Sequence, residues 1–133
     1  MIGELDAFVA LLRTGNLADK VDVGRTRKEP PYALVLPGST DDEQTRQTGP
    51  YAAEQLVYAV KCVGQSLDAV LLIAEEVDKR LRPPPMQFGV ALSVEGRDCS
   101  PIERGATDTY PIDDEKPSDW VALVLYKFTS EPT

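Results

Sequence analysis

The sequence contains no histidine among its 133 residues. Histidine is the side chain that most often serves as a general base near neutral pH and as a metal ligand. The chain also lacks a Gly-x-x-x-x-Gly-Lys phosphate loop, a Gly-x-Gly-x-x-Gly turn and a Gly-x-Ser-x-Gly nucleophile motif. These absences disfavour the commonest catalytic and metal-dependent mechanisms, so we expect no enzymatic activity, no metal and no cofactor.

Cysteine is scarce too, since Cys62 and Cys99 are the only two. Without histidine they do not form a zinc site. We expect Cys62 to be a small hydrophobic side chain on the apolar face of a strand, and Cys99 to be a surface thiol in a polar loop. Nothing in the sequence indicates secretion, so a disulfide is not predicted.

Basic residues are outnumbered, with 14 Lys and Arg against 22 Asp and Glu and a net charge of −8. This balance disfavours tight binding to nucleic-acid phosphates, which requires a basic surface. The N-terminal residues have neither a basic region nor a long apolar run. We therefore expect no membrane partner and a protein that is cytosolic or assembled from the cytosol into something larger.

Carboxylates are the remaining candidates for chemistry, in the runs Asp41–Glu43 and Asp113–Glu115. Either run could in principle supply an acid/base pair or bind Mg²⁺, but both lie in predicted loops. A catalytic pair needs groups fixed on a rigid frame. Solvated charge is therefore the favoured interpretation, and Glu75, Glu76 and Asp78 are expected on the solvent-exposed side of a helix.

The clearest pattern is a strand over residues 53–63 that runs into a helix over 66–82. Leu56, Tyr58, Val60 and Cys62 alternate with more polar neighbours, which is typical of a half-buried strand. Ser66 is a good helix N-cap. Apolar residues then follow at helical spacing before a triple proline ends the helix: Leu67, Val70, Leu71, Ala74, Val77 and Leu81.

Similar patterns predict the other elements: a helix over 2–14 and strands over 21–23, 32–36, 86–95 and 120–128. Residues 39–50 and 97–119 are expected to be polar surface loops, and 129–133 a loose tail. The last strand is apolar on both faces, so we expect it to lie centrally or to have one face covered by a partner.

These elements predict one domain over residues 1–133. Its fold class is α+β, with a mostly antiparallel sheet of about four to five strands and two flanking helices. Much of the core should come from five aromatic residues: Tyr32, Tyr58, Phe88, Trp120 and Tyr126.

The run Gln55–Ser66, followed by Ala69 and Ala74–Val77, resembles the middle of the tail terminator and tail-completion (head–tail joining) proteins of long-tailed bacteriophages. In that family a strand ending in a Val-Gly-x-Ser step leads into an amphipathic helix that ends in a basic Arg-Leu run. The flanking features agree: an N-terminal helix, Pro-Pro-Tyr at 30–32, Pro-Gly at 37–38 and a closing strand that ends Leu-Tyr-Lys-Phe-Thr-Ser at 125–130.

The resemblance implies a structural virion protein located in the tail or neck, with no enzymatic residues. Such proteins form a homo-oligomeric ring, commonly a hexamer, at the head-proximal end of the tail tube. The ring stops tube polymerisation and contacts the tail tube protein and the head-closure or connector protein. DNA passes through the ring without specific binding.

The polar loop over 39–50 is the candidate lumen or interface segment of such a ring, through Asp41, Asp42, Glu43 and Arg46. Acids that line the channel would repel DNA phosphates. Two alternatives stay open. One is a head–tail connector or stopper protein of the neck, and the other is a small acidic ligand-binding module whose loops bind a divalent cation.

Overall fold

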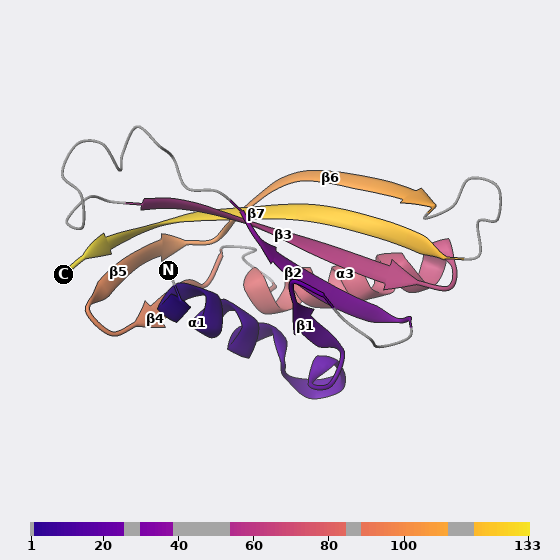
Figure 1. Cartoon of the computed structure of the whole chain (residues 1–133), viewed down its shortest axis with the longest axis horizontal. Helices are drawn as coiled ribbons and strands as arrows, with labels where there is room; N and C mark the ends of the chain where they lie inside the picture. Colours follow the sequence, from indigo (N-terminus) through magenta and orange to yellow (C-terminus); the bar gives the residue numbers. More distant parts are fainter. Residues whose placement is uncertain (1, 26–29, 39–53, 85–88, 112–118) are drawn as a thin grey trace.

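A computed structural model of the protein describes residues 2–25, 30–38, 54–84, 89–111 and 119–133. Figure 1 shows an elongated molecule in which the long strands β3 and β7 run from end to end. The elements in chain order are α1 (Ile2–Leu12), the 3₁₀ turn η1 (Gly15–Leu17), β1 (Val21–Val23), β2 (Tyr32–Pro37), β3 (Glu54–Gly64), α3 (Leu67–Leu81), β4 (Ala91–Val94), β5 (Arg97–Pro101), β6 (Glu103–Pro111) and β7 (Trp120–Pro132).

Within the described residues the strands form one seven-stranded sheet in the order β1-β2-β3-β7-β5-β4, and β6 pairs with β7 as well. Strands β1 and β2 are parallel, and every other pair is antiparallel. The α+β class is as predicted, but the sheet is mixed and larger than the four to five strands expected. β7 is central, which agrees with its apolar composition.

The additional strands β5 and β6 lie within residues 97–119, for which the sequence pattern predicted a surface loop. They follow one another along the same edge of β7: β5 pairs with its last residues, and β6 pairs with the part from Trp120 to Lys127. β6 consists mainly of polar residues, and its residues from Glu103 to Thr109 are exposed. An edge strand exposed on both faces lacks the alternating pattern by which strands are recognised.

Two further boundaries differ from prediction. The tail at 129–132 belongs to β7 because its backbone pairs with β5, so it is not loose. The strand predicted over 86–95 begins only at Ala91, because the N–H of Val90 donates to the carbonyl of Leu81 rather than joining the sheet. Residues 85–88 lie outside the described part of the chain.

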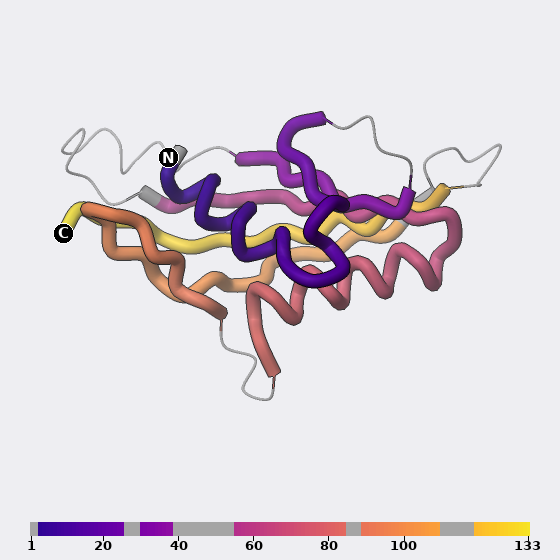
Figure 2. Tube along the Cα trace, turned by 90° about the horizontal axis from the view of Figure 1, so that it is seen from below, coloured from indigo at the N-terminus to yellow at the C-terminus, as the bar shows by residue number. Residues whose placement is uncertain are grey.

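Both helices pack on the same face of the sheet, as Figures 1 and 2 show from two directions. Phe8 of α1 places its ring edge-on to Tyr58 of β3, with centroids 4.9 Å apart. The aromatic cluster continues to Tyr126 and Phe128 of β7. Among the predicted aromatic core residues, Tyr58 and Tyr126 are fully buried, Tyr32 and Trp120 are half-buried, and Phe88 lies outside the described residues.

The Val-Gly-x-Ser step joins β3 to α3 and needs its glycine. A Cβ atom on Gly64 would lie 2.8 Å from the backbone nitrogen of Val70 and 3.1 Å from the Cβ of Ala69. Ser66 then caps the helix by accepting a hydrogen bond from the N–H of Ala69 at 3.1 Å. The close approach of strand end and helix start therefore fixes where α3 sits on the sheet.

We expect Gly64→Ala to lower the free energy of unfolding by about 1–3 kcal/mol, because backbone must move to admit the methyl group. Urea denaturation followed by circular dichroism measures this. Gly105→Ala is the control, since its Cβ would meet Leu125 at an ordinary 3.4 Å. Equal effects of the two substitutions would contradict the packing argument.

Candidate interaction surface

Asp41, Asp42, Glu43 and Arg46 lie outside the described residues, as do Asp113–Glu115. Within the described ranges, no group of three or more His, Cys, Asp or Glu side chains is arranged to hold a metal ion. None of the helices in these ranges has the length and apolar composition that a membrane span requires.

Both cysteines are free and buried. This corrects the prediction for Cys99, which lies on β5 with its side chain in the core rather than in an exposed loop. Burial raises the pKa of Cys62 to about 12. The Cys62 thiol therefore stays protonated at neutral pH and acts as a small core side chain.

Asp78 was expected on the solvent-exposed side of α3 but joins three elements instead. Its carboxylate accepts two hydrogen bonds of 3.0 Å from Arg82 and one of 3.1 Å from the hydroxyl of Tyr126 on β7. Arg104 of β6 lies 3.5 Å away. Burial alone raises the pKa of Asp78, but the bonds from Arg82 and Tyr126 outweigh it and leave the pKa below its usual value.

A second polar cluster ties the two ends of the chain together. Glu4 of α1 is buried, and the Ser130 hydroxyl of β7 donates to its carboxylate at 2.8 Å. Arg97 of β5 donates to the Ser130 hydroxyl at 2.9 Å and lies 3.5 Å from Glu4. Burial raises the pKa of Glu4, yet its hydrogen bonds hold the pKa below the usual value. Both clusters serve to join elements.

The sheet face opposite the helices is covered by neither α1 nor α3, and it is largely apolar. Partners directly opposite one another on neighbouring strands share a face. One row across this face is Leu36, Ala59 and Leu125, on β2, β3 and β7. The adjacent row has Leu34, Lys61 and Leu123 on the same three strands. Apart from Leu34, which is 8% exposed, these side chains are only half-buried.

Lys61 is a charged residue on the middle strand of this surface, and Lys127 of β7, which is paired to Glu103 at 3.8 Å, is another. Lys61 lies between Leu34 and Leu123 across the sheet and between Ala59 and Val63 along its own strand. Asp22 and Asp108 end the same row, each two strands away. Lys61 forms no ion pair with another residue in the described part of the chain.

A second apolar surface lies on the outward side of α3. Leu67, Leu71 and Leu72 are 40%, 46% and 62% exposed. The helical pattern had placed Leu67 and Leu71 with the core residues, but the buried stripe of α3 is narrower and consists of Val70, Ile73, Ala74, Val77 and Leu81. Asp68 lies among the three leucines, one residue from Leu67 and three and four from the others.

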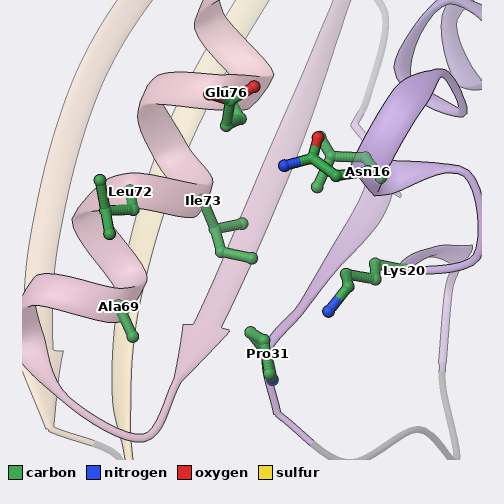
Figure 3. Close-up of a pocket in the computed structure, with 8 residues that line it drawn as sticks. Asn16, Lys20, Pro31, Ala69, Leu72, Ile73 and Glu76 are labelled. Atoms are coloured by element: carbon green, nitrogen blue, oxygen red, sulfur yellow. The ribbon is translucent and has the colours of Figure 1, made fainter.

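Beside Leu72 is a groove of about 290 Å³ between α3 and the segment around η1. Figure 3 shows Ala69, Leu72 and Ile73 on the helix side, with Asn16, Lys20 and Pro31 opposite. The groove extends the apolar surface of α3 toward the start of the chain. With its three exposed leucines, α3 thus offers contact area for another protein.

No protein-family model matches the sequence, and a search of curated protein sequences finds no significant relative. Solved structures do match the fold. A chain in the structure described as the virion of a native gene transfer agent particle aligns over 95% of this chain and 92% of its own, with 12% identity and a TM-score of 0.70. A second solved chain aligns over 99% and 93%, with 16% identity and a TM-score of 0.56. This chain therefore shares its whole fold with a protein of known structure.

Proposed function

We propose that this chain is a structural protein of a tailed-phage virion and, more finely, a tail terminator. The observation that carries the proposal is the match over nearly the full length of both chains to a component of the gene transfer agent virion. A whole-fold match supports a shared architecture for assembly, whereas a match of one part would support only a common motif.

The surfaces of the chain fit this role. A ring arises when two different patches on one subunit bind each other repeatedly and the rotation closes. The uncovered sheet face and the outward side of α3 are two different surfaces with exposed or half-buried apolar side chains, which is what such a contact requires. The proposed ring is a hexamer at the head-proximal end of the tail tube, where it stops tube growth and contacts the head-closure protein.

The polar loop at 39–50 has a proposed place in this ring. Asp41, Asp42, Glu43 and Arg46 would face the lumen or the next subunit, and the acids would repel the DNA that passes. A cryo-EM map of the assembled ring tests this directly. A loop that points away from the channel and from the neighbouring subunit would refute this part of the proposal.

The function is tested by mass photometry and negative-stain microscopy of the purified chain, alone and with the tail tube protein from the same source. We expect rings of six copies of the 14.6-kDa chain, and capped tubes of limited length when tube protein is present. Binding to the portal or adaptor protein instead of the tube would indicate a stopper. A protein that stays single-copy under all of these conditions would overturn the proposal.

A further inference from the structure

We propose that the uncovered sheet face of one copy binds the outward side of α3 on the next copy, with Lys61 paired to Asp68 across the contact. This inference rests on the proposed ring and names the two surfaces that form it. Its occupant is a second copy of this chain, for reasons of chemistry, size and placement.

The chemistry of the two surfaces is complementary. Lys61 is an ammonium group surrounded by Leu34, Leu123, Ala59 and Val63. Asp68 is a carboxylate beside the exposed Leu67, Leu71 and Leu72. The other charges of the two surfaces are already paired within the subunit, Lys127 with Glu103 at 3.8 Å and Lys79 with Glu75 at 3.3 Å. Lys61 and Asp68 are left as opposite charges among apolar side chains. Such pairing fixes the register of an interface and disfavours other partners.

Neither charge is neutralised by a described residue of its own subunit. Among those residues Lys61 and Asp68 take part in no ion pair. The backbones of Asp22 and Asp108 are two strands from that of Lys61, about 10 Å away, and Asp22 lies 3.9 Å from Arg13 instead. On α3, Glu75 is already paired to Lys79 at 3.3 Å. Asp68 is thus the available partner for Lys61.

The surfaces also match in length and position. The 15 residues of α3 extend over about 22 Å, and the stretch of β3 from Gln55 to Lys61, whose side chains on this face are half-buried, covers about 20 Å. A helix laid on the open face would complete a helix–sheet–helix layering of the sheet. Because the helices lie on one side of the sheet and the open face on the other (Figure 1), the contact is heterologous and can repeat around a ring.

Charge reversal tests the contact. Lys61→Glu and Asp68→Lys should each raise the protein concentration needed for half-assembly by about tenfold or more, because each places like charges opposite one another. The double variant restores an opposite pair and should return to within about threefold of the natural chain. An equimolar mixture of the two single variants should likewise recover assembly, since the sheet face of each variant then meets an opposite charge on the helix of the other.

Glu95→Lys and Arg25→Glu are matched controls, with the same charge changes at exposed positions that lie neither in the strand rows of the open face nor in the lining of the groove beside α3. Thermal unfolding by circular dichroism verifies that each variant folds. If Lys61→Glu does not fold, Lys61→Met replaces it, because methionine keeps the apolar part of the lysine side chain and lacks the charge. If neither single charge reversal changes the protein concentration needed for half-assembly, this contact is wrong. It is also wrong if the single variants fold but the double variant does not restore assembly. Either result would leave the proposed function standing. A natural chain that forms no ring, alone or with tube protein, would overturn the proposed function as well.

Discussion

Replacing Phe8 by alanine is expected to lower the free energy of unfolding by about 3–5 kcal/mol, among the largest effects of any single substitution in this chain. The side chain is fully buried and contacts the rings of Tyr58 and Tyr126, with centroids 4.9 and 6.3 Å away. The loss combines the transfer of a phenyl group to water with a cavity beneath the sheet. It is measured by urea unfolding at a concentration below that of assembly.

Val23→Ala is the control for this substitution, because Val23 is 38% exposed and should change stability by less than about 1 kcal/mol. Phe8→Leu retains most of the buried volume, so it should fall between the natural chain and the alanine variant. An alanine variant within about 1 kcal/mol of the natural chain would mean that α1 does not anchor on this face of the sheet.

The sequence predicted best where burial is one-sided. From Gln55 to Cys62, β3 alternates half-buried residues with fully buried ones, and α3 is bounded by Ser66 and the triple proline. Such elements lie close to their predicted ranges. β5 and β6 were missed because neither shows a long apolar alternation, and their place in the sheet depends on pairing with β7. Pairing of distant segments leaves no local trace in composition.

The uncovered sheet face and the outward side of α3 were also only partly predictable from the sequence. The doubly apolar last strand indicated either a central position or a covered face, and β7 is central with one face uncovered by the helices. In α3, helical spacing assigned Leu67 and Leu71 to the core because both lie near the edge of the apolar stripe. Whether the edge of the stripe is buried depends on what packs against the helix, and in this fold Leu67 and Leu71 are exposed.

Asp78 shows the opposite error, since a carboxylate on a charged helix face proved to be structural. Its spacing of four residues from Arg82 is typical of an ion pair on a helix, but the contacts with Tyr126 and Arg104 come from strands far along the chain. The sheet and helix layers are thus joined by polar contacts at Asp78 and by aromatic packing at Phe8. The contacts of Asp78 depend on its charge and therefore on pH, whereas the aromatic packing of Phe8 does not. Experiments at different pH values therefore separate the two contributions.

Asp78→Asn is expected to lower the free energy of unfolding at neutral pH by about 2–4 kcal/mol, somewhat less than for a wholly buried pair. The Asp78 side chain is 20% exposed, and the substitution leaves Arg82 and Arg104 without their counter-charge. Glu75→Gln is the control, because that side chain is 60% exposed and its ion pair with Lys79 contributes less than about 1 kcal/mol.

The difference between the natural chain and Asp78→Asn should depend on pH in a defined direction. The pKa of Asp78 is lowered in the folded protein, because the hydrogen bonds from Arg82 and Tyr126 outweigh the opposing effect of burial. Around its ordinary value of 3.8 the unfolded chain therefore binds more protons, so the stabilisation is complete above that pH and is lost as pH falls through the folded pKa. Urea unfolding at a series of pH values from neutral to acid should show the two proteins converging in acid, since a protonated Asp78 resembles asparagine. A difference that stays constant over this range would mean that the charge of Asp78 does not hold β6 and β7 to the helix.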